Sequence, residues 1–206
     1  VGYLFRFNAS IKKLKEIMKY IGKIHYITSR YIHSTKPPRK DSGAILNLGI
    51  HMIDILNFIL EERPKSVFSK KSNLLSEELE DSAIMLLNYK DFVASIEVSC
   101  CHPKKRRDMW IIGSNEKVYI DFLKQELIRY PIGVGCEGVI RKKEKKEDIT
   151  PNEPLKDELI YFCKCVAERR LTEFENIENI GKEEIFSTKI CELCLKSAKT
   201  GKEIVL

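Results

Sequence analysis

The sequence predicts an α+β domain, with helices packed on one face of a mostly antiparallel open sheet of about six or more strands. Two helical patterns, separated by a strand-like run, occupy the first part of the chain. About six short runs rich in β-branched and aromatic residues follow, and the short turns between them favour antiparallel neighbours. Two more helical patterns close the chain.

The first elements are expected to be a strand, a helix and a second strand. Residues 1–7 (VGYLFRF) alternate as a strand does, and Asn8 is a favourable N-cap for the helix that follows. Gly22 ends that helix, and residues 23–33 are rich in β-branched and aromatic side chains. Residues 34–43 contain two prolines and are expected to form a loop.

The rest of the chain continues as one domain over residues 1–206. A long apolar helix is expected over residues 43–61. The expected strands are residues 65–74, 81–89, 92–100, 107–114, 117–123 and 126–131, with 101–105 as one of the turns. The closing elements are helices at 154–170 and 181–200, with Gly201 ending the second, and a strand at 203–206.

Charge and hydropathy exclude several classes of protein. The net charge of +6 comes from mixed Lys and Glu, which indicates a solvated surface and does not indicate a nucleic-acid partner. The basic runs at 104–108 and 141–148 fit exposed strands or loops, with phosphate binding as the alternative. No apolar run is long enough to span a bilayer, and no signal peptide is present. Because the chain begins inside a strand-like run, we expect that an N-terminal part is missing.

The seven cysteines are expected to be buried thiols rather than ligands or disulfides. Their pairs, at 100–101, 163–165 and 191–194, lack the spacing of a zinc finger, although a zinc or disulfide role is the alternative. An odd number of cysteines fits a reducing, cytoplasmic setting.

The segment GVGCEG, residues 133–138, has the spacing of a dinucleotide-binding loop. Such a loop must follow a strand and open a helix, so that the pyrophosphate meets the helix N-terminus. The residues that follow, VIRKKEKKED, have no helical apolar face. We therefore expect a turn between exposed strands here and no cofactor-binding residue in this chain.

A polar stripe crosses the apolar helix expected at 43–61. Asn47, His51 and Asp54 fall within roughly 60° of one another at about 100° per residue. Polar groups on a buried helix need partners, so the stripe either makes internal hydrogen bonds or lines a cleft. Histidine suits proton transfer near neutral pH. A metal site using His51 and Asp54 is a further alternative, and Gly49 indicates close packing beside the stripe.

The order of these motifs resembles the C-terminal domain of the glucose–fructose oxidoreductase and inositol dehydrogenase (Gfo/Idh/MocA) family of NAD(P)-dependent dehydrogenases. The likeness rests on residues 1–8, on SGAILNLGIHMID at 42–54, and on the closing helices, PLKDELIYFCKCV and ICELCLKSAKTGKEIVL. It covers nearly the whole chain, and G-x-H-x-x-D is its most specific part.

The resemblance implies hydride transfer from a sugar carbon to NAD or NADP, with His51 as the acid/base. The cofactor would be bound mainly by an N-terminal Rossmann domain that also supplies a lysine from an E-K-P motif, and neither is present in this chain. Asn47 stands where an Asp is common in the polyol and inositol branches, and would hold His51 or the substrate. N-x-G-x-H is more like the branch that acts on nucleotide-linked amino sugars.

The resemblance also suggests substrate contacts and partners. Arg6, Arg30, Arg39 and Asp54 are the candidate substrate-binding residues, and Asp54 would mainly orient the helix or His51. The expected partners are a sugar or sugar-nucleotide substrate and further copies of the chain, joined through the open sheet face. No nucleic acid, membrane or metal is expected. The competing hypotheses are a non-catalytic relative that senses a ligand or acts as a scaffold, and an unrelated interaction module.

Overall fold

The computed structural model describes residues 2–34, 41–60, 62–135, 138–167 and 182–206. Its helical segments are η1 (Leu4–Phe7), α1 (Ala9–Ile21), η2 (Ile45–Gly49), α2 (Ile50–Ile59), α3 (Pro154–Ala167) and α4 (Lys182–Thr200). Its strands are β1 (Ile24–Ser34), β2 (Ser66–Ser72), β3 (Ser82–Asn88), β4 (Val93–Ser99), β5 (Cys101–Gly113), β6 (Lys117–Asp121), β7 (Glu126–Tyr130), β8 (Ile132–Gly135), β9 (Gly138–Arg141), β10 (Lys145–Lys146) and β11 (Ile204–Val205).

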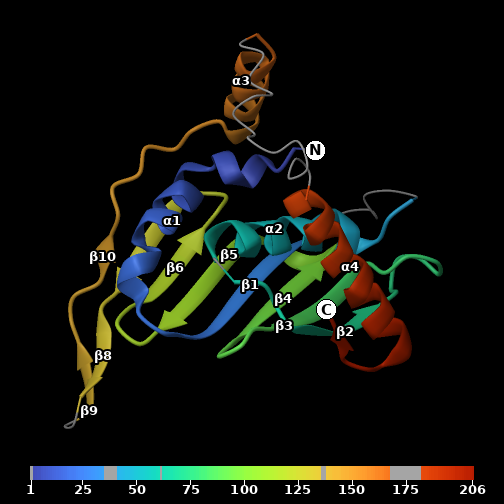
Figure 1. Ribbon diagram of the computed structural model, residues 1–206, viewed down its shortest axis with the longest axis horizontal. Helices are drawn as coiled ribbons and strands as arrows, with labels where there is room; N and C mark the ends of the chain where they lie inside the picture. Colours follow the sequence, from blue (N-terminus) through green and yellow to red (C-terminus); the bar gives the residue numbers. More distant parts are fainter. Residues whose placement is uncertain (1, 35–40, 61, 136–137, 168–181) are drawn as a thin grey trace.

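The predicted fold class is confirmed. Within the described residues, a nine-stranded sheet runs in the order β10-β7-β6-β5-β1-β4-β3-β2-β11. The helices α1, α2 and α4 lie over one face of this sheet (Figure 1). The two meanders β2–β3–β4 and β5–β6–β7 are antiparallel, as expected, but β1 lies between them and runs parallel to β4. The meander is therefore split by an early strand, which the short turns between the later strands do not reveal.

The core lies between the sheet and these helices. The helical pattern predicted for α1 is confirmed, since Ile11, Leu14 and Ile17 are buried. Asn8 caps α1 by accepting a hydrogen bond from the Ser10 amide, and Gly22 ends it with a φ of 77°. The long helix is also confirmed, and it begins with a π-helical turn, η2, before α2. Such turns are rare and occur often at functional sites.

The strand predicted for residues 1–7 is wrong, because residues 4–7 form the 3-10 helix η1. This segment packs against helices rather than joining a sheet edge. Phe5 is buried, and its ring lies 5.5 Å from the His51 ring. Arg6 pairs with Asp54 of α2. These tertiary contacts override the local strand-like pattern, and they bring η1 into the neighbourhood of the polar stripe.

Two expectations about the later strands had different outcomes. The turn predicted at 101–105 is wrong, because β5 begins at Cys101 and pairs with β1 as far as Ser34. The turn between strands that was predicted at GVGCEG is confirmed. The strands β8 and β9 pair with each other antiparallel across it, and they form a separate hairpin beside the main sheet (Figure 1). No helix opens on this segment.

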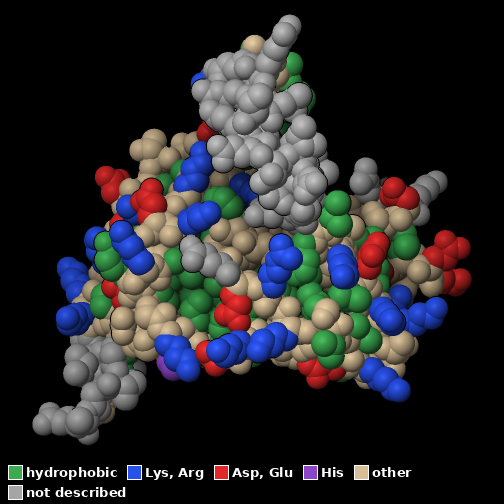
Figure 2. Space-filling model, viewed as in Figure 1, with side chains coloured by type: hydrophobic (Ala, Val, Ile, Leu, Met, Phe, Trp, Pro, Cys, Tyr) green, Lys and Arg blue, Asp and Glu red, His purple; other side chains and the backbone are tan. Residues whose placement is uncertain are grey.

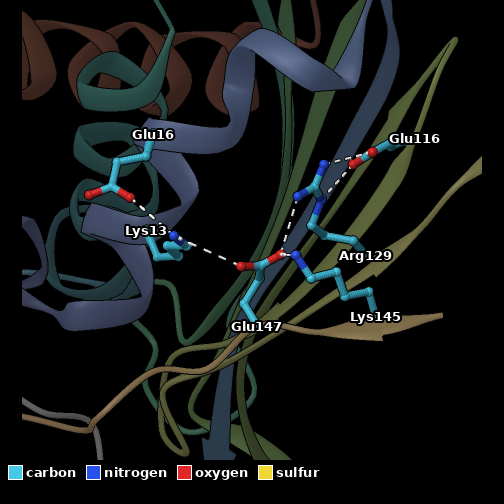
Figure 3. A network of polar contacts seen from close by, with 6 residues as sticks. All are labelled: Lys13, Glu16, Glu116, Arg129, Lys145 and Glu147. Carbon is cyan, nitrogen blue, oxygen red and sulfur yellow. Dashed lines mark hydrogen bonds and ion pairs between the residues drawn. The ribbon is translucent and has the colours of Figure 1, made fainter.

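The basic run at 141–148 forms the edge of the sheet, as predicted. Lys145 and Lys146 of β10 are exposed and pair antiparallel with β7. The next residue, Glu147, is buried and forms an ion pair with Arg129, with Glu147 Oε1 lying 3.2 Å from Arg129 Nη1. Figure 3 shows that Glu147 also joins this edge to α1, through Lys13 at 3.9 Å. The alternating charges of this run thus fasten an edge strand, with Lys on the outside where it discourages further pairing.

The helix α3 stands apart from the rest of the molecule (Figure 1). None of its residues is buried, although its sequence is mostly apolar. The exposed apolar side chains are Leu155, Leu159, Ile160, Tyr161, Phe162 and Val166. Its contact with the body is made at η1, where the rings of Phe7 and Tyr161 lie 5.6 Å apart. A helix that is apolar on most sides is normally covered by other protein.

The cysteine prediction is confirmed only in part. Cys100, Cys191 and Cys194 are buried, and burial raises the pKa of the Cys194 thiol to about 12. Cys163 on α3 is exposed, which contradicts the expectation that all the thiols are buried. Cys136 lies outside the described residues.

Candidate functional site

The helix that carries the polar stripe is held at its start by Glu80, from the loop before β3. The Glu80 carbonyl accepts a hydrogen bond from the Ala44 amide at 2.8 Å, and its carboxylate accepts one from the Ile45 amide at 3.0 Å. A Cβ added at Gly43 would lie 2.2 Å from that carboxylate. Glycine at this position therefore lets a buried acid cap the helix, which fixes where the helix begins.

The expectation of close packing at Gly49 is confirmed, and the neighbour is the sheet. A Cβ added there would lie 2.8 Å from the terminal methyl of Met85 on β3. The helix therefore lies close against the strands, and its polar stripe is directed elsewhere.

The three residues of the polar stripe, Asn47, His51 and Asp54, lie in three different surroundings. Asp54 is buried, and its carboxylate accepts hydrogen bonds from Arg6 Nε at 3.0 Å and Arg6 Nη2 at 2.5 Å. Arg6 also lies over the rings of Tyr3 and Phe58. The predicted substrate residues Arg6 and Asp54 are thus brought together as an ion pair that ties η1 to α2. A contact of either residue with substrate stays a prediction.

Asn47 does not bond to the His51 ring in this structure. Its amide nitrogen instead donates to the Ser42 carbonyl at 2.9 Å and to Ser42 Oγ at 2.8 Å. The amide therefore secures the turn before the helix. A contact between Asn47 and substrate stays a prediction.

His51 lies in an aromatic setting formed by η1 and β1. Its ring meets the Phe5 ring edge-on at 5.5 Å and stacks with Tyr31 at 6.0 Å. Its Nδ1 is enclosed and has no hydrogen-bond partner within the described residues. Burial, and secondarily the positive charge of Arg107, lower the pKa of His51 to about 4. The imidazole is therefore neutral near pH 7, which is the form that accepts a proton.

Three residues beside His51 were not among the predicted site residues, although His33 was considered as a residue that could approach His51 in the metal alternative. Tyr31 and His33 lie on the face of β1 that is directed toward the helices, and Arg107 lies opposite Tyr31 on β5. Four enclosed side-chain atoms lack a partner in the described ranges, and three of them are His33 Nε2, His51 Nδ1 and Arg107 Nε. Unpaired buried polar atoms are costly and uncommon, so their concentration marks this cluster as the candidate site.

The period-two pattern of β1 carried a signal for two of these residues. Tyr31 and His33 are two positions apart, so a strand places both on one face. The signal for Arg107 was weaker, since it stands in a basic run that is typical of solvated surface.

The other predicted arginines are not in this cluster. Arg30 donates to both carboxylate oxygens of Asp108, at 2.8 and 2.7 Å, on the face of the sheet away from the helices. Its neighbour Tyr31 faces His51, and successive side chains of a strand point to opposite faces. Arg39 lies outside the described residues.

Within the described ranges, no group of side chains could form the alternative metal site. No three His, Cys, Asp or Glu side chains gather there as a metal ion would need. Asp54, the proposed companion of His51, is already engaged by Arg6.

None of the helices in the described ranges combines the length and hydropathy that a bilayer crossing requires.

The depressed pKa of His51 predicts a stability that depends on pH. The folded pKa of about 4 lies below the ordinary value of 6.5, so the unfolded chain binds the proton first as the pH falls. Stability is fully present above pH 6.5, and we expect about 3 kcal/mol to be lost toward pH 4. The pKa of His33 is lowered in the same direction by burial.

Urea unfolding at several pH values measures this loss. His51→Phe should remove most of the slope between pH 6.5 and 4, whereas His25→Asn, at an exposed position, should leave it unchanged. An unaltered slope in the His51 variant would contradict the assignment.

Comparison with known proteins identifies the family of this chain. A family model described as the GFO/IDH/MocA C-terminal domain matches residues 11–119, just over half of the chain. The chain belongs to the GFO/IDH/MocA family. The match includes the helix with His51 and the strands with Tyr31, His33 and Arg107, so the whole candidate cluster except Phe5 lies inside the family domain.

Named relatives of this GFO/IDH/MocA chain include a curated enzyme and solved structures. Myo-inositol 2-dehydrogenase of Thermotoga maritima is 32% identical in an alignment of 100 residues that covers 43% of this chain and 30% of the enzyme. An inositol dehydrogenase homologue from Azotobacter vinelandii, solved with NADH and myo-inositol, matches with a TM-score of 0.81 and 14% identity, over 100% of this chain and 64% of its own. UDP-N-acetylglucosamine 3-dehydrogenase GnnA from Acidithiobacillus ferrooxidans matches with a TM-score of 0.69 and 22% identity, over 82% of this chain and 53% of its own.

This chain therefore spans between about half and two thirds of the solved relatives. The similarity to the solved structures establishes the fold, and the family model establishes the family.

Proposed function

We propose that this chain is the substrate-binding and oligomerisation domain of an NAD(P)-dependent oxidoreductase, acting on a sugar, polyol or nucleotide-linked sugar. The observation that carries the proposal is the cluster around His51: a neutral imidazole among aromatic rings, next to enclosed polar atoms without partners. Such a group of convergent polar residues and perturbed pKa values is typical of a site for a small polar ligand.

In this proposal His51 takes the hydroxyl proton of the substrate. Its Nδ1 is enclosed, so Nε2 is the nitrogen that a substrate hydroxyl can approach. The nicotinamide, when bound, accepts the hydride from the same carbon. Phe5 and Tyr31 hold the imidazole ring in place and exclude water from one side of it. The low pKa of His51 keeps it ready to accept the proton at neutral pH.

GVGCEG does not have the setting that the pyrophosphate of a dinucleotide needs. The strands β8 and β9 pair on either side of it, and in the described residues that follow, the chain continues as β9 rather than as a helix. We propose that a Rossmann domain preceding Val1 binds the NAD or NADP. The exposed apolar side chains of α3, beside the N-terminal segment η1, support a further domain packed at this end of the molecule (Figure 1).

The open face of the sheet supports the proposed homo-oligomer. It carries Trp110, whose ring lies 4.9 Å from Tyr119 and 5.5 Å from Tyr130. Tyr26 and Ile84 on the same face are exposed by 46% and 57%. Exposed apolar and aromatic side chains grouped on a sheet face are typical of a protein interface. The free thiols of the described residues fit a reducing, cytoplasmic setting.

A non-catalytic, ligand-binding relative is the second candidate, and Asn47 favours it. Asn47, one turn before His51, is bonded to Ser42, and Asp54, one turn after it, is bonded to Arg6, so neither of these stripe residues orients the His51 ring. A binding protein needs the cluster but does not need an oriented base.

The proposal is tested in the full-length protein encoded by the complete reading frame. The sequence before Val1 should contain a strand, a G-x-G-x-x-G turn and a helix. Purified full-length protein should then reduce NAD or NADP with at least one of myo-inositol, glucose and UDP-N-acetylglucosamine. Binding of one of these compounds without any reduction would favour the ligand-binding relative, and an unrelated upstream sequence would contradict the enzyme.

A further inference from the structure

Arg107 is part of the cluster around His51, and its positive charge contributes to lowering the pKa of His51. It lies opposite Tyr31 in the β1–β5 register, and its guanidinium carbon is 4.2 Å from the Tyr31 ring centroid. The same carbon is 6.0 Å from the Phe5 ring centroid. Because Phe5 and Tyr31 are also the two rings against His51, Arg107 and His51 share one setting.

Arg107 differs from the other half-buried arginines in having no carboxylate partner in the described structure. Arg6 is paired with Asp54, Arg30 with Asp108, and Arg129 with Glu116 and Glu147. Arg107 contacts aromatic rings, and its Nε is enclosed without a hydrogen bond. Partly buried charges are normally paired, so this cation is retained at a cost in stability.

The nearby carboxylates are already engaged elsewhere. Asp54 is held by Arg6, Glu80 caps η2, and Asp108 pairs with Arg30 on the opposite face of the sheet. A second cation, Lys105, lies close enough to His33 to lower its pKa together with Arg107. The charge beside His51 is therefore positive.

This charge is local to the cluster. Figure 2 shows Lys and Arg side chains spread over the helix-bearing face with Asp and Glu between them, rather than collected in one stripe. The adjacent Arg106 pairs in register with Ile32, so it points to the other face of the sheet from Arg107.

We propose that Arg107, assisted by Lys105, binds an anionic oxygen group of the ligand, so that the ligand of the His51 site is a sugar derivative carrying a carboxylate or a phosphate. This rests on the proposed function. The planar guanidinium, stacked on Tyr31, presents paired N–H donors that match either oxyanion. The anion supplies the partner that Arg107 lacks in the protein and directs the sugar hydroxyls toward His51.

The experiment measures binding to this chain, so it does not depend on turnover. Glucuronate is the carboxylate probe, glucose 6-phosphate is the phosphate probe, and glucose is the neutral reference. The chain has only four histidines, so NMR of ¹³C-labelled histidine locates the bound probe. We expect an anionic probe to shift the His33 and His51 signals while His25 and His102 stay unchanged. Whichever anionic probe binds more tightly identifies the source of the charge.

Substitution separates a specific contact from general attraction. Arg107→Gln should weaken binding of the anionic probe by about tenfold to a hundredfold and leave glucose unchanged. Arg107→Lys should retain part of the affinity, and Arg106→Gln is the matched control that should retain all of it. Far-ultraviolet circular dichroism verifies that each variant is folded.

The proposal is overturned if neither anionic probe binds, if both bind no more tightly than glucose, or if Arg106→Gln weakens binding as much as Arg107→Gln. Anion binding at this site without hydride transfer by the full-length protein would leave this inference standing and remove the proposed enzyme. Turnover of neutral sugars that is unaffected by Arg107→Gln would support the proposed enzyme and contradict this inference.

Discussion

His51→Ala in the full-length protein is expected to lower kcat by a factor of about 10² to 10⁴, which is the range for loss of a general acid/base. In the proposed mechanism the neutral imidazole of His51 accepts the hydroxyl proton as the hydride leaves, and alanine cannot do so. Tyr31 is a poor substitute, because burial raises its pKa. Steady-state kinetics with the best substrate measure the loss.

Two controls accompany this variant. Cofactor affinity, measured by fluorescence titration with NADH, should remain within about threefold of the wild type, since the proposal assigns cofactor binding mainly to a Rossmann domain outside this chain. His25→Ala changes an exposed histidine and should leave kcat unaltered. If NADH affinity fell in parallel with kcat, the loss would reflect a damaged interface instead of a missing base.

Asp54→Ala is expected to lower the free energy of unfolding of this chain by about 3–5 kcal/mol. The Asp54 carboxylate is 1% exposed and accepts two charge-assisted hydrogen bonds from Arg6. Its removal takes away the carboxylate that accepts these hydrogen bonds from the partly buried Arg6 guanidinium. Because the pair joins η1 to α2, the loss should also loosen Phe5 from His51. Urea unfolding monitored by circular dichroism measures the change.

Exposed and repacked variants provide the comparison. Glu126→Gln removes an exposed ion pair with Lys146 and should cost less than about 1 kcal/mol. Replacing both partners, as Arg6→Met with Asp54→Leu, should recover most of the lost stability, because no buried charge remains. A cost for Asp54→Ala as small as that of Glu126→Gln would show that the buried pair contributes little.

Local patterns predicted the helices well, and they predicted the strand pairing less well. The spacing of Ile11, Leu14 and Ile17 determines the buried face of α1, and Asn8 and Gly22 determine its ends. The position of β1 depends on contacts with β4 and β5, which are distant in sequence. No local pattern encodes that pairing, so the split meander required the structure.

The same distinction applies to the candidate site. His51 was predictable because it is a titratable residue on an apolar helix. Its surroundings were not predictable, because Phe5 comes from a segment whose sequence pattern predicts a strand. In the structure this segment forms the 3-10 helix η1. The role proposed for Arg107 depends on the structure. There, Arg6 and Arg30 are paired with carboxylates, whereas Arg107 lies against aromatic rings.

Asn47 and Asp54 show the limit of a shared helix face. The stripe was predicted either to make internal hydrogen bonds or to line a cleft, and each of its outer members is held inside the protein by a different partner, Ser42 or Arg6. Helical spacing places side chains on one side of a helix, but the hydrogen bonds that they make depend on which groups the tertiary fold supplies there.

Chemical rescue of the His51→Ala full-length protein tests most directly whether His51 is the acid/base. The substitution leaves a space next to Phe5 and Tyr31 in which free imidazole can bind. We predict that added imidazole raises the rate of nicotinamide reduction in this variant, with a saturable dependence on its concentration, and does not change the rate of the wild type. Nicotinamide reduction by His51→Ala at the wild-type rate in the absence of imidazole would contradict the account.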